Sequence, residues 1–241
     1  MTLAPATLLA EAGALWRAER PLLAPLAGLF LMLPALAMLL LLPQPDPVAA
    51  DGSAMTTEAL VAYALANAPA ILAANLMQLY GATVILALFL GSPRPTLAQA
   101  LRGALALLPL VVIASIAVWA MVFVGAIVIV PALYLIGRCF LVTPAIVAEG
   151  PIGPVAAISR SFALTRRRGW LFFAIAAMIF VVGQAVVVLA GGMEQAVAEA
   201  GIGSPVSTIG FNLVAAMATA AASVATLLVK VVVYRRLSSG I

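Results

Sequence analysis

The sequence contains no histidine and only one cysteine among 241 residues. Without histidine, the chain lacks the commonest general base and the commonest metal ligand of proteins. The single cysteine, Cys139, excludes an intramolecular disulfide, and its apolar surroundings are typical of a small buried side chain. The chain also has no GxxxxGK[ST] loop, no GxSxG turn and no CxxC pair. Serine–lysine chemistry would need Lys230, the only lysine, beside Ser223. From these absences we expect no metal, no cofactor and no enzymatic activity.

Charged residues are also scarce, since they make up 8% of the chain while apolar residues make up 66%. Soluble domains carry about 25% charged and about 45–50% apolar residues, so a soluble fold could not cover its surface with this composition. The lipid bilayer is the solvent that suits it. We predict an all-α, polytopic transmembrane helical bundle of about six spans with short interfacial helices. It forms a single integral membrane domain over residues 1–241.

The span boundaries follow from the lengths of the apolar runs. A spanning helix needs roughly 20 apolar residues. Residues 104–148 contain a single charge, Arg138, and as one helix they would measure about 67 Å. Because the hydrocarbon core is only about 30 Å thick, two spans broken near Gly125 or Pro131 fit better. The predicted spans are 21–42, 69–90, 104–124, 128–148, 169–189 and 209–234.

The distribution of charge predicts the orientation of these spans. Placing the N-terminus in the cytoplasm makes every loop obey the positive-inside bias. The inner segments then hold Arg17, Arg20, Arg94, Arg102, Arg160, Arg166, Arg167, Arg168, Arg235 and Arg236. The outer segments hold Asp46, Asp51, Glu58, Glu194 and Glu199, and no basic residue. We therefore expect both termini in the cytoplasm and a first apolar run that is retained as a span.

Three predicted inner stretches look interfacial, namely residues 2–19, 92–102 and 154–168, and on the outer side Ser53 or Thr56 could cap a helix. In the third stretch, Val155, Ile158 and Phe162 follow the spacing of one helical face. The candidates for lipid contact in the inner leaflet are Arg160, Arg166, Arg167, Arg168 and Trp170. One interpretation is that these arginines bind anionic lipid; the other is that they only hold the loop in the cytoplasm.

Arg138 is the eleventh residue of the predicted span 128–148, close to mid-membrane. A central arginine costs about 2.5–3.5 kcal/mol on insertion scales, so we expect it to face the bundle interior. Its candidate partners are Asn75, Gln78, Gln184 and the carbonyl of Phe140, which Pro144 leaves without its usual N–H donor.

Two interpretations of this candidate intramembrane polar site stay open. In the first, Arg138 binds an anionic headgroup or solute, and Asn75, Gln78 and Gln184 line a path for it. In the second, Arg138 bonds helix ends, and the amides make hydrogen bonds between packed helices. The sequence alone does not favour one for Arg138.

The stretch around Arg138 resembles a known family. Arg138 is followed by PAIVAEG at residues 144–150, by SRSFALT at 159–165 and by Trp170. This order is similar to that of the glycerophosphoryl diester phosphodiesterase membrane-domain family, and the resemblance covers about residues 130–173. The matching positions are Arg138, Pro144, Glu149, Ser161, Leu164 and Trp170.

The resemblance implies a bacterial inner-membrane domain and offers no catalytic role for any matching residue. Members fused to a phosphodiesterase use histidine acid/base chemistry with a carboxylate-bound metal, and this chain has no histidine. With five residues after Arg236, we expect no catalytic domain in it.

Together these features predict a non-catalytic, multi-pass protein of the bacterial cytoplasmic membrane. We expect an accessory or scaffold protein that interacts through its cytoplasmic surface with membrane lipids, anionic headgroups among them, or with a membrane protein partner. No nucleic-acid partner is expected. The alternative is a small transporter or channel with a polar site around Arg138.

Overall fold

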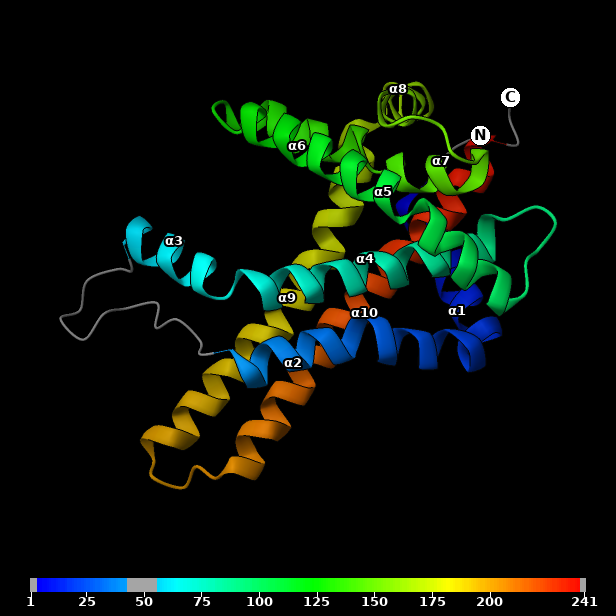
Figure 1. The fold of residues 1–241 in the computed structure, drawn as a ribbon. Coiled ribbons are helices and arrows are strands. Elements are labelled where there is room, and N and C mark those ends of the chain that lie inside the picture. Colours follow the sequence, from blue (N-terminus) through cyan, green and yellow to red (C-terminus); the bar gives the residue numbers. More distant parts are fainter. Residues whose placement is uncertain (1–3, 43–55, 239–241) are drawn as a thin grey trace.

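The computed structural model describes residues 4–42 and 56–238, and in this part of the chain every regular element is a helix (Figure 1). Six helical segments of the described residues are long and apolar enough to cross a membrane. They are Pro5–Leu41, Ala68–Leu90, Leu97–Gly125, Ile129–Glu149, Gly169–Glu199 and Pro205–Ser238. The predicted all-α bundle of about six spans is therefore confirmed, and the chain has the architecture of a multi-pass membrane protein.

The first span is longer than the apolar run 21–42. Helix α1 (Pro5–Ala27) continues through the π-helical turn η1 (Gly28–Met32) into α2 (Leu33–Leu41). The described part of the predicted interfacial stretch 2–19 is helical, and it is continuous with the first span because Pro21 lies inside α1. Leu8 near the start of α1 is fully buried, and α1 packs against the last helix, α10. Tertiary packing thus extends the helix beyond the membrane-spanning run.

Side-chain caps begin the short helix before the second span and the third span itself. Thr56 accepts a hydrogen bond from the N–H of Ala59 and caps the short helix α3 (Thr57–Ala66), as predicted, while the alternative cap Ser53 lies outside the described residues. Helix α4 (Ala68–Leu90) follows α3. Thr96 and Gln99 form a capping box at the start of α5 (Leu97–Gly125). The predicted surface helix at 92–102 is therefore only the first turn of α5.

The fourth span is broken in a place that the sequence did not predict. The turn after Gly125 is confirmed, but Pro131 lies inside α6 (Ile129–Arg138). The chain then leaves the helix at residues 139–141 and resumes as α7 (Val142–Glu149). Pro144 has no N–H and cannot donate the backbone hydrogen bond of a continuous helix. At the break itself, the N–H of Leu141 donates to the Ser161 hydroxyl at 3.2 Å.

The last three helices complete the bundle. Helix α8 (Pro154–Leu164) packs on α5 and α7, while α9 (Gly169–Glu199) and α10 (Pro205–Ser238) form a long hairpin. The buried face of α8 carries Ala157, Ser161 and Leu164, whereas Val155 is 81% exposed. Of the predicted helical face, Ile158 and Phe162 pack against a buried cluster and Val155 does not.

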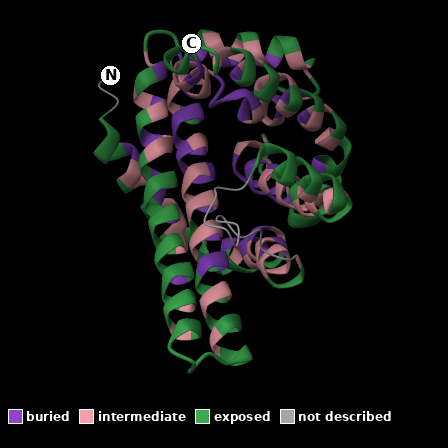
Figure 2. Ribbon diagram, turned by 90° about the vertical axis from the view of Figure 1, so that its left-hand side faces the viewer, coloured by how far each residue is buried: buried purple, intermediate pink, exposed green. Residues whose placement is uncertain are grey.

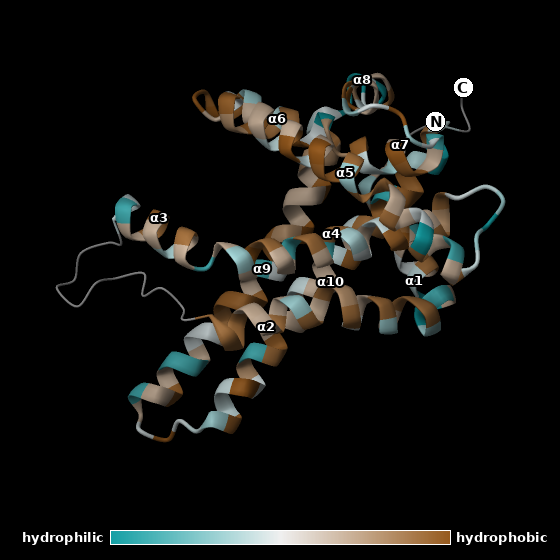
Figure 3. Cartoon of the chain, viewed as in Figure 1, coloured by the Kyte–Doolittle hydropathy of each residue, from teal (hydrophilic) through white to brown (hydrophobic). Residues whose placement is uncertain are grey.

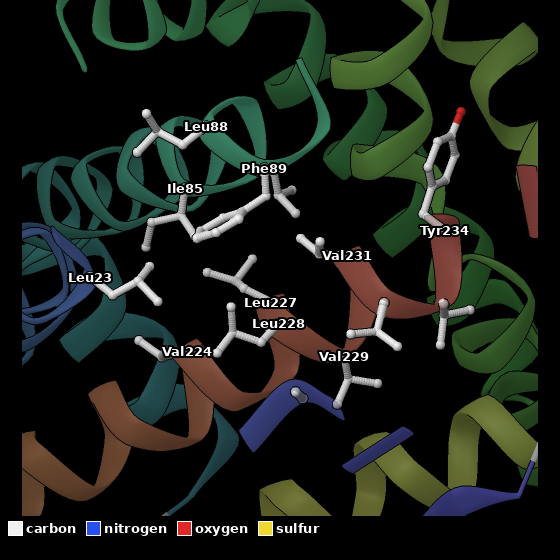
Figure 4. Close-up of a cluster of buried hydrophobic side chains, with 14 of the residues drawn as sticks. Leu23, Ile85, Leu88, Phe89, Val224, Leu227, Leu228, Val229, Val231 and Tyr234 are labelled. Carbon is white, nitrogen blue, oxygen red and sulfur yellow. The ribbon is translucent and has the colours of Figure 1, made fainter. Parts of the chain in front are cut away.

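The core lies at one end of the helices and thins toward the other. Buried side chains from α1, α4 and α10 interlock around Leu23, Ile85 and Leu228 (Figure 4). The far ends of α9 and α10 are exposed (Figure 2), and so is the α5–α6 turn, where Phe123 is 80% exposed. The two hairpins, α5–α6 and α9–α10, diverge away from the end where α1 begins and α10 finishes (Figure 1). The helices are thus held together mainly at that end.

Many large apolar side chains are exposed on the outside of the helices, and apolar residues predominate along most helices in the hydropathy colouring of Figure 3. Large exposed apolar patches on a soluble protein mark interaction sites or aggregation liabilities. In a bilayer these side chains meet hydrocarbon and not water, so their exposure costs no free energy of hydration. The exposed apolar surface therefore agrees with the six candidate spans.

Close helix contact at Gly81 yields a test of this packing. A β-carbon on Gly81 would overlap the β-carbon of Phe30, so Gly81→Ala must push α4 away from η1. We expect the free energy of unfolding in detergent to fall by about 1–3 kcal/mol, the range for overpacked cores. Gly103→Ala is the control, because nothing lies within 4 Å of its β-carbon position and alanine is the better helix former. Equal stability of the two variants would contradict the α4–η1 contact.

Candidate functional site

Each described acidic residue of the predicted inner segments has an arginine partner. Glu19 pairs with Arg94, which precedes α5, at 2.6 Å. Glu149 at the end of α7 pairs with Arg160 of α8 at 2.5 Å. Glu11 of α1 pairs with Arg236 near the end of α10. The pairs of Glu11 and Glu19 join segments that are far apart in the sequence, whereas the Glu149 pair joins consecutive helices. Each of the three carboxylates is neutralised by its arginine.

The Glu149 carboxylate connects three helices. Its Oε1 atom accepts hydrogen bonds from Nε of Arg160 and, at 2.8 Å, from the hydroxyl of Tyr234 in α10. The hydrogen bond from Arg160 to the carboxylate raises the pKa of Arg160 above its ordinary value. Arg160 was predicted to contact lipid, but its Nε is engaged in this structural pair.

Outside the predicted spans, six arginines have no ion pair and no side-chain hydrogen bond with another described residue. They are Arg17, Arg20, Arg102, Arg166, Arg167 and Arg168. All six belong to segments predicted to face the cytoplasm, and three of them form the turn between α8 and α9. We call this set the unpaired arginines. They give these segments a positive charge that no described side chain compensates.

The turn between α8 and α9 presents these groups at the protein surface. Arg166 and Arg167 are exposed, and Arg167 has a φ of 61°, in the left-handed region that L residues rarely adopt. Trp170, in the first turn of α9, is 49% exposed and packs against the ring of Tyr134 with centroids 5.8 Å apart. The predicted lipid-contact residues other than Arg160 are thus accessible together.

Arg138 lies at the C-terminal end of α6 and not in the middle of a continuous helix. Its backbone carbonyl accepts hydrogen bonds from the hydroxyls of Ser161 at 2.6 Å and Thr165 at 3.2 Å. Its guanidinium carbon lies 4.7 Å from the ring centroid of Phe162 and 5.8 Å from that of Tyr134. The helix break at residues 139–141 thus places Arg138 beside α8 and the start of α9.

None of the partners proposed for the Arg138 side chain bonds to it. Within the described residues its Nε atom is enclosed and has no acceptor. The side-chain amides of Asn75, Gln78 and Gln184 and the carbonyl of Phe140 form no hydrogen bond with the Arg138 side chain. Ser161 and Thr165, the groups that hold its backbone, were not predicted. Ser161 lies on the buried face of α8 and Thr165 is the C-terminal cap of that helix. Their spacing of four residues in the sequence was the available signal.

The three amides predicted with Arg138 do come together. Asn75, Gln78 and Gln184 line a cavity of about 430 Å³ between η1, α4, α9 and α10. Three hydroxyl side chains of α10 line it as well, those of Thr219, Ser223 and Thr226. Arg138 is not on its wall, so the structure separates the predicted polar site into two places.

Most polar groups of this cavity are satisfied by their own helices. The amide of Asn75 donates to the Ile71 carbonyl at 2.8 Å, and each of the three hydroxyls donates to the carbonyl four residues earlier. The side-chain amides of Gln78 and Gln184 have no hydrogen bond to another described residue. They are the groups free to bind a molecule in the cavity.

Other candidate chemistry finds no support from the contacts. Within the described residues, no group of three His, Cys, Asp or Glu side chains could hold a metal ion. The hydroxyl of Ser223 donates to the Thr219 carbonyl, and Nζ of Lys230 lies 5.3 Å from the ring centroid of Phe140. The serine and lysine are therefore each engaged elsewhere.

Comparison of the chain with protein-family models, with curated proteins and with solved structures finds no match. The resemblance over residues 130–173 therefore stays a prediction.

The Glu149 contacts predict an uneven response to charge removal. Glu149→Gln removes the charge that Arg160 and Tyr234 share, and we expect a loss of about 1.5–3 kcal/mol in the free energy of unfolding, as for hydrogen bonds to charged groups. Arg94→Gln is the matched control, because the Arg94 side chain is 59% exposed and exposed pairs contribute about 0–1 kcal/mol. Unfolding in detergent would measure both. Equal losses would show that Glu149 does not hold α7, α8 and α10 together.

Proposed function

We propose that the chain is a non-catalytic accessory protein of the bacterial cytoplasmic membrane that binds anionic lipid at its cytoplasmic surface. The single observation that carries the proposal is the set of unpaired arginines. Every described acid in the same segments already has an arginine partner. The remaining positive charge is therefore available to anionic headgroups.

The physical chemistry of the inner leaflet supports this choice. Anionic lipids give that leaflet a negative surface potential, and each basic residue near it contributes about 1 kcal/mol of attraction. The turn at 165–168 places three arginines next to Trp170, and tryptophan is enriched at headgroup level. A lipid-binding surface needs this combination of accessible cations and an interfacial aromatic side chain.

A lipid-preference experiment tests the proposal. The protein is reconstituted in nanodiscs of mixed phosphatidylglycerol and phosphatidylcholine, and the lipid retained around it is compared with the bulk mixture. We expect phosphatidylglycerol to be enriched several-fold and the triple change Arg166→Gln, Arg167→Gln, Arg168→Gln to remove most of this enrichment. The corresponding triple lysine variant keeps the charge and should keep the enrichment. A wild-type protein without enrichment would refute the proposal and leave the arginines as topology signals only.

A small transporter or channel is the second candidate, and the amide-lined cavity is the observation that favours it. Gln78 and Gln184 come from different helices and have no hydrogen-bond partner among the described residues. An unpaired amide facing hydrocarbon is costly, so a cavity filled with water or solute would suit these two side chains. The cavity does not include Arg138, so this candidate loses the cation that the sequence had assigned to it.

Water access to the cavity can be measured with introduced thiols. In a Cys139→Ala background, Gln184→Cys should react with a membrane-impermeant thiol reagent, because thiolates form only where water is present. Val188→Cys on the same helix is the control, since Val188 is 68% exposed on an apolar outer face and should stay unlabelled in lipid. An unreactive thiol at position 184 would exclude the transporter candidate in its present form.

A further inference from the structure

Two aromatic rings and the start of a helix lie beside the side chain of Arg138. Phe162 of α8 and Tyr134 of α6 flank its guanidinium. Gly169, the first residue of α9, lies against its stem, since a β-carbon there would be 3.0 Å from Cδ of Arg138. The guanidinium is therefore positioned at the N-terminal end of a 31-residue helix.

This cation has no acceptor among the described residues. Its Nε is enclosed without a hydrogen bond. The two terminal nitrogens are not enclosed in the same way and also have no partner in the described chain. Arg138 as a whole is half-buried, but enclosed polar nitrogens such as its Nε nearly always have a partner. The terminal nitrogens are therefore open to acceptor oxygens from a group outside the protein.

The start of α9 adds further donors at the same place. The N–H groups of Gly169 and Trp170 have no acceptor in the described chain, and Arg168 caps the helix without a side-chain bond. No acidic residue lies in the first turn. Free N–H groups and the helix dipole make such an end favourable for an anion. Arg138 and this helix end thus both favour an anion at the same place.

The available oxygens nearby are already used. The Arg138 carbonyl accepts from the buried hydroxyls of Ser161 and Thr165. The nearest carboxylate in the sequence, Glu149, is occupied by Arg160 and Tyr234. A ligand for this place must therefore bring a negative charge and several acceptor oxygens, and phosphate combines both. Arginine recognises phosphate through two parallel N–H donors.

We infer that Arg138, together with the first turn of α9, binds the phosphate of an anionic lipid headgroup. The adjacent arginines Arg166, Arg167 and Arg168 supply the surrounding positive potential. Trp170 and Tyr134 pack on each other beside the site. This inference rests on the proposed function for the orientation of the surface, and it adds one defined site to a general preference for anionic lipid.

Lipid titration of the delipidated protein, followed by native mass spectrometry, tests the site. Phosphatidylglycerol should bind with one affinity at least tenfold above that of further lipids, while phosphatidylcholine should show no such first site. Arg138→Gln should abolish the first site. Arg138→Lys, which keeps the charge but loses the paired donors, should weaken it by several-fold.

Arg102→Gln is the matched control, because Arg102 is an unpaired arginine outside this site. It should leave the first phosphatidylglycerol in place. The inference is overturned if Arg138→Gln binds that lipid as tightly as wild type, or if Arg102→Gln weakens it equally. In the second case a general basic surface, and hence the proposed function, still stands.

A competition arm separates a lipid from a soluble phosphate. If the site takes a lipid, millimolar glycerol 3-phosphate or inorganic phosphate should leave the first phosphatidylglycerol bound. If either displaces it at that concentration, the site selects free phosphate and the lipid assignment is wrong. Thermal unfolding of each variant in detergent shows that it is folded, and removal of an unpaired cation should leave the midpoint unchanged or raise it.

Discussion

A charge is costly in hydrocarbon, and this constraint decides where the chain can place its few ionised groups. The described ion pairs lie outside the predicted apolar spans, where Glu11 and Glu19 meet arginines from distant segments and Glu149 at the end of α7 meets Arg160 of the next helix. Two of these pairs reach the end of α10, directly through Arg236 or through Tyr234 beside Glu149. The packed core lies at the same end, around Leu23, Ile85 and Leu228. Charge pairing and dense packing therefore coincide, and the helices diverge where both are absent.

The divergence has a functional consequence. The α5–α6 turn and the far ends of α9 and α10 expose apolar side chains and make few contacts with the rest of the bundle. Regions with few buried contacts open at low free energy. The amide-lined cavity, bordered by Gln78 of α4 and Gln184 of α9, lies between the packed end of the bundle and the diverging end. The firmly held end is thus the better place for a defined lipid site, and the diverging end is the better place for movement.

Hydropathy and charge predicted most of the fold, because a spanning helix must be apolar over its length. The Thr56 cap and the turn after Gly125 also followed from local signals. Helix ends outside the membrane were predicted less well. Helix α9 runs through Gly191 and Gly192 to Glu199, since glycine weakens a helix by only about 1 kcal/mol and pairing with α10 compensates.

The candidate site was predicted in part, because Asn75 and Gln78 share a face by their spacing and meet Gln184 once α4 and α9 are neighbours. The position of Arg138 could not be deduced, because it depends on the break at residues 139–141. That break combines a local cause, Pro144, with a tertiary one, the Ser161 hydroxyl that accepts from Leu141, and a hydropathy profile contains no information about the second.

The proposed lipid site requires that the paired, basic end of the bundle faces the cytoplasm. Single cysteines at positions 160 and 195, each in a Cys139→Ala background, test this orientation in intact cells with a membrane-impermeant thiol reagent. We expect Gln195→Cys to be labelled from outside and Arg160→Cys to be labelled only after the membrane is permeabilised. Labelling of position 160 in intact cells would contradict the cytoplasmic orientation.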